Sequence, residues 1–388
     1  LSLSLSLSLS LSLSLSLKTY KHLLKQKKKL FRKNLAESLA NNISDSAQFW
    51  KELKQFGGWR KTGISAEIKS EDWYEHFKNV YSTGEINIEG TVESNSNVKE
   101  NENHVLNMQI SEEEVERAIS NLKPRKAPGL DGITSEMLKA GSKTVISFLE
   151  KLFNQIFDKG IYPKEWAKAI VIPIFKKGDA DNPDNYRGVS LISILCKCYT
   201  SILNSRLYQW LEDTHSIAEN QAGFRKNHST VDHIFTLYSV VQKCMHSRRR
   251  KLYVAFIDFK KAFDYVHHDK LLETINTAGI KGKCLCSIKA MYDSLLSCVR
   301  IGNDYTDFFS CPTGVRQGCV LSPTLFSLFI DQLASHIDTS GIHGIQLLPT
   351  MMELFILLFA DDVALLSTTP RGLQSQLNSL KVCCNKLE

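Results

Sequence analysis

Two adjacent carboxylates interrupt the apolar stretch LLFADDVALL at residues 357–366. The runs on either side, 357–360 and 363–366, have the composition of β-strands. The stretch therefore predicts a hairpin whose tip carries Asp361 and Asp362. Like charges side by side at the end of a buried strand cost free energy unless a cation neutralises them. One interpretation is a plain polar hairpin tip; the other is a metal site, which requires a third carboxylate.

The sequence LYVAFIDFKKAFD offers that third carboxylate at Asp258. The apolar run from Leu252 to Ile257 predicts a strand that ends at this residue. If the strand lay beside the hairpin tip, the three carboxylates would come together, and divalent cations would offset their repulsion. Two Mg²⁺ ions held in this way can align a nucleoside triphosphate with a 3′ hydroxyl for in-line phosphoryl transfer.

The composition is that of a globular protein with a mild excess of basic charge. The chain has 388 residues, 43% of them hydrophobic, and a formal net charge of +7. That length is enough for two or three subdomains with a sizeable core. Lysine and arginine gather in two runs, 18–33 and 247–251. Such runs are typical of a solvated helix face, of phosphate-backbone contacts or of a targeting signal.

Cysteine usage and hydropathy bear on the cellular compartment. The ten cysteines lack the C-x-x-C spacing of zinc sites, and no secretory signal is visible. The pattern predicts reduced, mostly buried thiols in an intracellular protein. No apolar stretch reaches the roughly 18 residues that a membrane span needs, so no membrane partner is expected.

The chain divides into four segments by pattern. Residues 1–17 alternate Leu and Ser, as translation of a CT dinucleotide repeat would, and carry no fold signal. Residues 18–109 predict a basic helical extension followed by a polar linker. Residues 110–250 and 251–388 mix amphipathic helices with short strands, starting with a helix capped by Ser111. This mixture predicts an α+β fold with an antiparallel sheet packed on helices.

Seven short motifs, in this order along residues 110–388, resemble those of reverse transcriptases of non-LTR (LINE-type) retrotransposons. They are KAPGLDGI, IPIFKKGD, NYRGVSL, QAGFRKNHST, FIDFKKAFD, GVRQGCVLSPTLF and FADD. The resemblance implies a right-hand polymerase, with fingers over residues 110–250 and palm over residues 251–388. It also implies that the chain stops before the thumb. Gly188 departs from the pattern, because many relatives carry proline there.

The resemblance also implies roles for individual residues. Asp258 and Asp361 would be the metal ligands, with the main-chain carbonyl of Phe259 completing a shell and Asp362 as the adjacent catalytic carboxylate. Phe263 matches the steric gate that excludes a ribose 2′-hydroxyl; the alternative is a plain core phenylalanine. The remaining implied contacts are with the deoxynucleotide, through Lys176, Lys177, Arg187, Gln317 and Gly318, and with the template, through Arg225 and Lys226. A surface basic turn is the alternative for Lys176, Lys177 and Arg187.

Three polar residues near Asp258 receive simpler interpretations from the local pattern. Asp264 is expected to cap the helix that follows it. His267 and His268 are expected to be solvated, since no partners lie at metal-ligand spacing.

The resemblance implies an RNA-directed DNA polymerase with an RNA template, a DNA primer, deoxynucleoside triphosphates and two Mg²⁺ ions, with Mn²⁺ as the alternative metal. It would be intracellular, and nuclear when acting on target DNA; the pattern gives no oligomeric state. The alternative function is an inactive, truncated remnant that at most binds nucleic acid, and a group II intron maturase is a third interpretation. Without a thumb to hold the duplex, weak nucleic-acid binding and poor polymerisation are expected.

Overall fold

The computed structural model describes residues 25–27, 29–30, 33, 68–82, 105–141, 143–246, 251–339, 344–346 and 353–387. The chain separates into two units, 1–65 and 66–388. In the first unit the described residues are helical and exposed. The Leu-Ser repeat, most of the polar linker and residues 247–250 of the second basic run lie outside the described residues. The second unit carries all the elements below.

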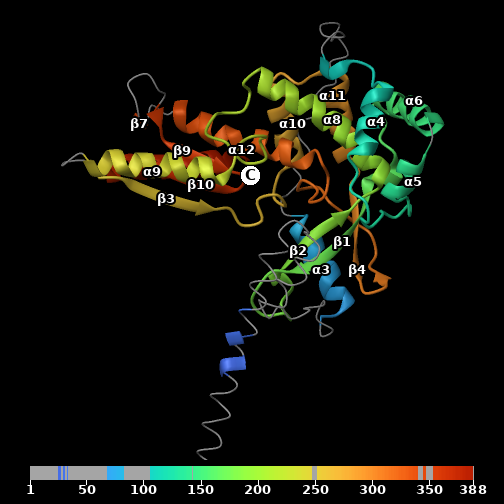
Figure 1. Cartoon of the computed structure of the whole chain (residues 1–388), viewed down its shortest axis with the longest axis horizontal. Coiled ribbons are helices and arrows are strands. Elements are labelled where there is room, and N and C mark those ends of the chain that lie inside the picture. Colours follow the sequence, from blue (N-terminus) through green and yellow to red (C-terminus); the bar gives the residue numbers. More distant parts are fainter. Residues whose placement is uncertain are drawn as a thin grey trace, which may run out of the picture. The chain divides into compact units, whose positions relative to one another are not determined.

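One sheet of the second unit is built around a long hairpin (Figure 1). Its strand order is β2-β1-β4-β5, and β6 pairs with β4. The strands are β1 (Lys168–Phe175), β2 (Tyr186–Leu191), β4 (Leu296–Ile301), β5 (Asp304–Tyr305) and β6 (Phe309–Ser310). A short helix, η2 (Pro183–Asn185), lies in the β1–β2 connection. β1 and β4 run parallel, and the other pairs are antiparallel.

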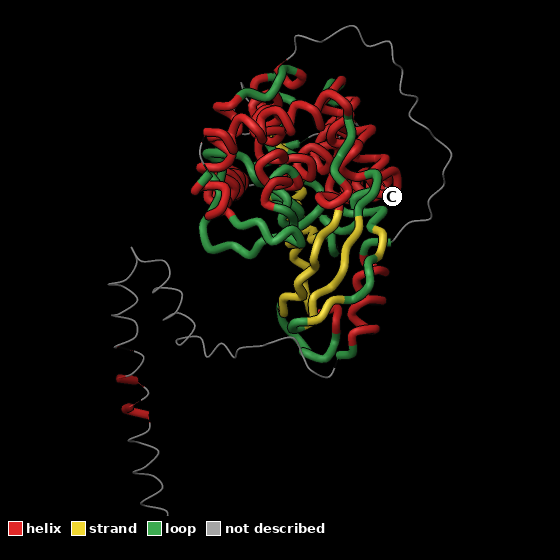
Figure 2. Tube along the Cα trace, turned by 90° about the vertical axis from the view of Figure 1, so that its right-hand side faces the viewer, coloured by secondary structure: helices red, strands yellow, loops and turns green. Residues whose placement is uncertain are grey.

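Helix α3 (Ser70–Val80) packs against this sheet through aromatic side chains. Trp73 is fully buried and meets the ring of Tyr186 edge-on, with centroids 4.8 Å apart. Figure 2 shows these strands extending away from a body made mostly of helices.

The helical body surrounds α8 (Ile194–Asp213), whose inner side chains are buried. The other members are η1 (Val105–Asn107), α4 (Glu112–Ser120), α5 (Ser135–Ala140), α6 (Lys143–Lys159), α7 (Lys164–Ala167), α10 (His268–Thr277) and α11 (Gly282–Tyr292). The expected cap at Ser111 is confirmed, because its side chain accepts a hydrogen bond from the Glu114 amide. Arg206 then joins α8 to α4 through a two-point contact with Glu114.

The second sheet has the antiparallel order β3-β10-β9, from β3 (Tyr253–Asp258), β10 (Asp362–Ser367) and β9 (Ile356–Phe359). Helix α9 (Thr230–His246) covers one face, where Val240 and Cys244 pack against Val254 and Leu366. Leu365 alternates to the other face and is buried. Helix α13 (Pro370–Leu387) contacts β3 and β10 and packs on α12 (Ser322–Thr339). A separate pair, β7 (Ile345–Gln346) and β8 (Glu353–Leu354), lies nearby in Figure 1.

The predicted α+β class is confirmed, and so is the hairpin over the FADD stretch, which forms β9 and β10. The predicted position of its tip is wrong by one residue: the turn is Ala360–Asp361, and Asp362 begins β10. The parallel β1–β4 pairing was not predicted. Most cysteines are buried, as expected. Among the described residues, no helix combines the length and apolar character that crossing a bilayer requires.

Candidate active site

The three carboxylates meet at one edge of the second sheet. Asp258, the last residue of β3, pairs directly with Asp362, the first residue of β10. Asp362 also pairs with Phe359 across the hairpin, so Ala360 and Asp361 form the two-residue turn between β9 and β10. The structure therefore brings together the three acids that the sequence singled out. Their role as metal ligands stays a prediction.

The electrostatics of this edge suit a cation. Partial burial, then the neighbouring charges of Asp361 and Asp258, raise the pKa of Asp362 above its ordinary value. Among the described residues, no three acidic, histidine or cysteine side chains are already arranged around one metal position. Mg²⁺ commonly uses only one or two carboxylates and completes its shell with water and substrate phosphates. This donor set of neighbouring carboxylates fits such an open site better than a closed protein cage.

The β9–β10 turn is supported by residues 220–223, which lie beside β9. The amide of Leu358 donates to the Asn220 carbonyl at 2.8 Å, and the Ala222 amide donates to the Leu358 carbonyl at 2.9 Å. Gln221 has 0% exposure, and its Oε1 accepts from the amides of Gly223 and Ala360 at 2.7 and 3.3 Å. These contacts fix the backbone that carries Asp361.

Gly223 matters here because a side chain would not fit. A Cβ on Gly223 would lie 2.1 Å from the Ala360 nitrogen. Gln221 and Gly223 belong to the QAGFRKNHST motif, but the sequence alone predicted no role for either residue. A glycine two residues after Gln221 in a turn-like motif was the available signal, since glycine permits close backbone approach.

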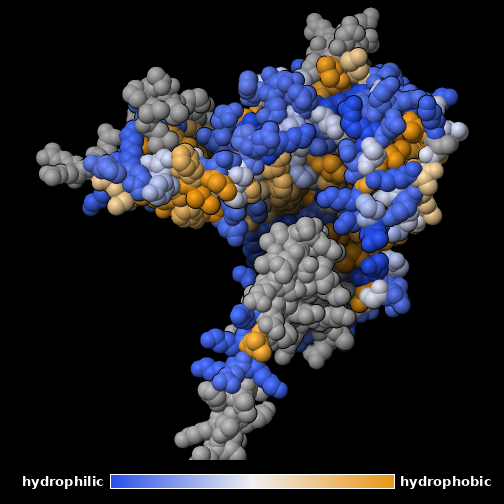
Figure 3. Space-filling view, in the orientation of Figure 1, coloured by the Kyte–Doolittle hydropathy of each residue, from blue (hydrophilic) through white to orange (hydrophobic). Residues whose placement is uncertain are grey.

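A groove of about 420 Å³ runs from the carboxylate edge along α9. Its lining joins Asp258 and Asp362 to apolar and aromatic side chains of α9, β3 and β9, among them His233, Phe256 and Phe359. Figure 3 shows hydrophobic surface over α9 and β3. Exposed apolar side chains there are Val231, Ile234, Phe235, Tyr238 and Phe256.

The residues predicted to hold the nucleotide lie on the β1–β2 hairpin and the loop before α12. Lys176 and Lys177 follow β1 and are exposed, and Arg187 is exposed on β2. Arg187 Nε donates to Gln317 Oε1 at 2.7 Å. The structure thus brings Arg187 and Gln317 together.

Gly318 allows this loop to approach β2. Its φ is +138°, and a Cβ there would lie 2.4 Å from the Ser190 carbonyl oxygen. The Ser190 amide donates to the Gln317 carbonyl at 2.8 Å. The main chain therefore joins the hairpin to the loop that carries Gln317.

Phe263 is half-buried between two other rings. It stacks on Phe326 with centroids 4.1 Å apart and meets Phe224 edge-on at 5.9 Å. Its carbonyl accepts a hydrogen bond from the Val315 amide at 2.8 Å, which ties it to the loop before α12. The ring is therefore held in place without being enclosed, and its role as a steric gate stays a prediction.

Two simpler expectations for neighbouring residues are wrong. Helix α10 begins at His268 after His267, so Asp264 does not cap it; its carboxylate instead accepts from Gln317 Nε2 at 2.9 Å. His268 is not freely solvated, because its Nε2 donates to the Gly314 carbonyl at 2.9 Å and its ring lies on Tyr292. Burial lowers the pKa of His268.

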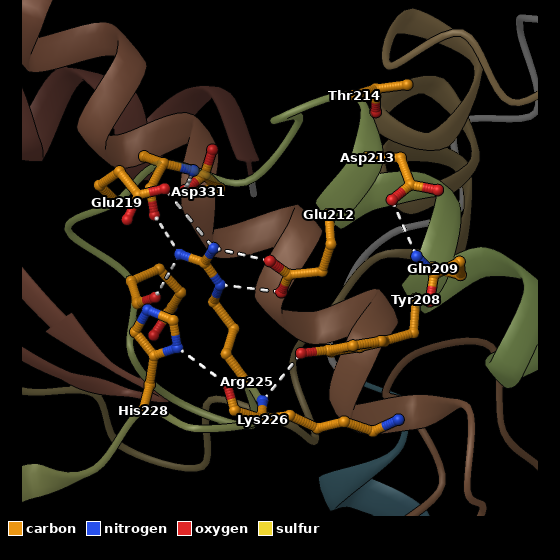
Figure 4. Close-up of polar contacts among 12 residues, drawn as sticks. Tyr208, Gln209, Glu212, Asp213, Thr214, Glu219, Arg225, Lys226, His228 and Asp331 are labelled. Carbon is orange, nitrogen blue, oxygen red and sulfur yellow. Dashed lines mark hydrogen bonds and ion pairs between the residues drawn. The ribbon is translucent and has the colours of Figure 1, made fainter.

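Arg225 was predicted to contact the template, but the structure buries its side chain. It is 8% exposed, and its guanidinium binds Glu212 at two points, 2.8 and 3.0 Å (Figure 4). The carbonyls of Ala218 and Gln221 accept further hydrogen bonds from Nη1. The Arg225 hydrogen bond holds the pKa of Glu212 below its usual range. We correct the expectation for Arg225: it stabilises the loop that supports the β9–β10 turn. Lys226 is exposed and stays a candidate contact.

Replacing Arg225 with glutamine is expected to lower the free energy of unfolding by about 3 kcal/mol, because it leaves a partly buried Glu212 without its partner. Urea denaturation measures this loss. The matched control is Lys226→Gln, which should change stability by less than about 0.5 kcal/mol. Unchanged stability together with weaker template binding for Arg225→Gln would restore the template role.

Comparison with known proteins identifies the family of the chain. A family model described as "Reverse transcriptase (RNA-dependent DNA polymerase)" matches residues 174–388. The chain belongs to this family. Proteins of mobile elements are among its relatives. The chain is a reverse transcriptase domain of the non-LTR retrotransposon type. The resemblance drawn from the seven motifs is confirmed.

Two relatives illustrate the match. The chain is 29% identical over 284 residues to "Probable RNA-directed DNA polymerase from transposon BS" of Drosophila melanogaster, covering 71% of this chain and 30% of that protein. It is 30% identical over 263 residues to the "Retrovirus-related Pol polyprotein from type-1 retrotransposable element R2" of Popillia japonica, covering 66% and 34%. The chain thus spans about 30% of the length of the curated relatives it matches first.

Among solved structures, the chain aligns with apo telomerase from Candida tropicalis with a TM-score of 0.42 and 12% identity. The alignment covers 61% of this chain and 51% of that one.

Proposed function

We propose that this chain carries the catalytic centre of an RNA-directed DNA polymerase, which joins a deoxynucleotide to a primer 3′ hydroxyl on an RNA template. The observation that carries the proposal is the direct pairing of Asp258 with Asp362 at the tip of the β9–β10 hairpin. Family membership supports the reaction class.

Asp258 and Asp361, with the Phe259 carbonyl, would hold two Mg²⁺ ions, and Asp362 would add its charge beside them. The donor set supports this choice, since hard divalent cations prefer carboxylate and carbonyl oxygens. When bound, such ions activate the attacking hydroxyl and neutralise charge on the leaving pyrophosphate. Mn²⁺ has the same ligand preference and is the alternative.

We infer that the β1–β2 hairpin belongs to the fingers and that β3, β9 and β10 form the palm. Lys176, Lys177 and Arg187 would bind the triphosphate, a role suited to arginine because its planar fork can contact two phosphate oxygens. Gln317 and Gly318 would lie against the new base pair. Residues 220–223 and α9 precede residue 251 yet pack on the palm strands, so in this proposal the palm includes them.

The proposed partners are an RNA template and a DNA primer. The groove beside Asp258 would receive the primer end, where its aromatic lining offers a surface for base stacking. Lys226 would contact the template backbone. Action on target DNA would place the protein in the nucleus. The second candidate is a remnant that binds nucleic acid without catalysis; the presence of all three carboxylates at one edge of the sheet favours the catalytic proposal over it.

Primer extension on an RNA template with Mg²⁺ tests the reaction, and Phe263→Val tests sugar selection in the same assay. Whatever nucleotide addition the parent supports, slow as it is expected to be, should use deoxynucleotides and reject ribonucleotides. Removing the ring opens space for a 2′-hydroxyl, so the variant should gain at least tenfold in ribonucleotide use while deoxynucleotide use changes far less. Phe148→Val, an exposed ring on α6, is the matched control. Equal sugar discrimination in parent and variant would remove the gate from Phe263.

A further inference from the structure

The side-chain amide of Gln317 bridges two opposite charges. Its Nε2 donates to the Asp264 carboxylate at 2.9 Å, and its Oε1 accepts from Arg187 Nε at 2.7 Å. A carboxylate anion only accepts hydrogen bonds, and a guanidinium only donates them. A flipped amide would turn its oxygen toward Asp264 and its N–H groups toward Arg187. The two charges therefore permit only one orientation of the amide.

The backbone around Asp264 is built to hold this contact. The Gly314 amide donates to the Val266 carbonyl, and the Val315 amide donates to the Phe263 carbonyl, each at 2.8 Å. Gly314 has a φ of +88°, and a Cβ there would lie 2.8 Å from the Asp264 carbonyl oxygen. The loop that carries Gln317 is thus fixed against the segment that carries Asp264.

The charge of Asp264 is set by its surroundings. Burial raises the pKa of this carboxyl to about 6, against the opposing effects of the Gln317 hydrogen bond, Lys261, Arg187 and Lys176. At neutral pH the group is therefore mostly ionised. Lys176 lies just after β1, Arg187 on β2 and Lys261 in the turn after β3.

We propose that Asp264 is a positioning residue for the incoming deoxynucleoside triphosphate: it fixes the Gln317 amide, which in turn fixes Arg187. The inference rests on the proposed function. The Gln317 contact uses Nε of Arg187, which directs the terminal nitrogens, the pair suited to phosphate oxygens, away from Gln317. Because the two side chains are ordered before the nucleotide arrives, nucleotide binding does not include the entropy cost of ordering them.

The test measures the affinity of dATP for the full chain bound to an RNA template and a dideoxy-terminated DNA primer, in Mg²⁺. Asp264→Ala is expected to weaken dATP binding about tenfold, since a lost hydrogen bond to a charged group is worth about that factor. Affinity for the template–primer itself should change by less than about twofold. Asp304→Ala, an exposed carboxylate on β5, is the matched control for charge. Thermal unfolding of each variant checks the fold.

A double-mutant cycle separates positioning from simple damage. Gln317→Glu sets two carboxylates against each other, and adding Asp264→Asn restores a donor opposite Glu at 317. The loss of dATP affinity caused by Gln317→Glu should therefore be at least threefold smaller when Asp264→Asn is present. Additive losses of dATP affinity in the two variants would overturn this inference but leave the proposed function standing. A dATP affinity of Asp264→Ala within twofold of the parent would do the same. Failure of the parent to form any dATP-dependent complex would overturn the proposed function, and the inference with it.

Discussion

Replacing Asp361 with alanine is expected to lower the rate of nucleotide addition about a thousandfold. The charge stabilisation supplied through a metal ligand is worth several kcal/mol, and each 1.36 kcal/mol corresponds to a factor of ten in rate. Single-turnover primer extension on an RNA template measures the rate. Asp258→Ala should give a loss of the same order, because it lies across from Asp362 at the same edge.

The fold should not suffer from this change. Asp361 is one of the charges that raise the pKa of Asp362, so its removal relieves repulsion and the melting temperature should stay level or rise slightly. An exposed carboxylate far from the turn, Asp304, provides the control variant Asp304→Ala. Polymerisation by Asp361→Ala at a rate near that of the parent would refute the metal-ligand role.

Adding a single methyl group at Gly223 is expected to lower polymerisation about a hundredfold. The new Cβ would lie 2.1 Å from the Ala360 nitrogen, so the turn that carries Asp361 must move by about 1 Å, a displacement that can cost a hundredfold in rate. Overpacking of this kind also costs about 1–3 kcal/mol of stability. Primer extension and urea denaturation of Gly223→Ala measure the two effects separately.

Gly302→Ala is the matched control for Gly223→Ala. Gly302 has a φ of +63°, and a Cβ there meets nothing within 4 Å. This variant should lose about 1–2 kcal/mol from backbone strain and keep its polymerase activity. Equal activity of the two alanine variants would show that residues 220–223 do not position the catalytic turn.

The parts of the site that could be predicted are those that short, local sequence patterns determine. Apolar runs on both sides of Asp361 define two strands and their turn, and the run before Asp258 defines a third. Seven motifs in order then gave the family, which the comparisons confirm. Ser111 signalled its helix start through the neighbouring residues alone.

The parts that could not be predicted depend on contacts between distant segments. Asp264 precedes a helix by a few residues, a position typical of a cap, but a loop about fifty residues later supplies its partner, Gln317. Arg225 lies in a basic motif, and the neighbouring sequence does not show that Glu212 of α8 will form a two-point ion pair with it. Gln221 acts through backbone amides, for which side-chain patterns carry no signal.

The order of the strands has a consequence for synthesis on the ribosome. β3 ends in Asp258, but the strand that pairs with it, β10, is translated roughly a hundred residues later. Domains generally fold from the N-terminus during synthesis, so the helical body and the β1–β2 hairpin can form first. Until β10 has been translated, β3 would have an unpaired edge, with α9 covering one of its faces. A nascent chain therefore has no complete carboxylate edge until translation has passed β10.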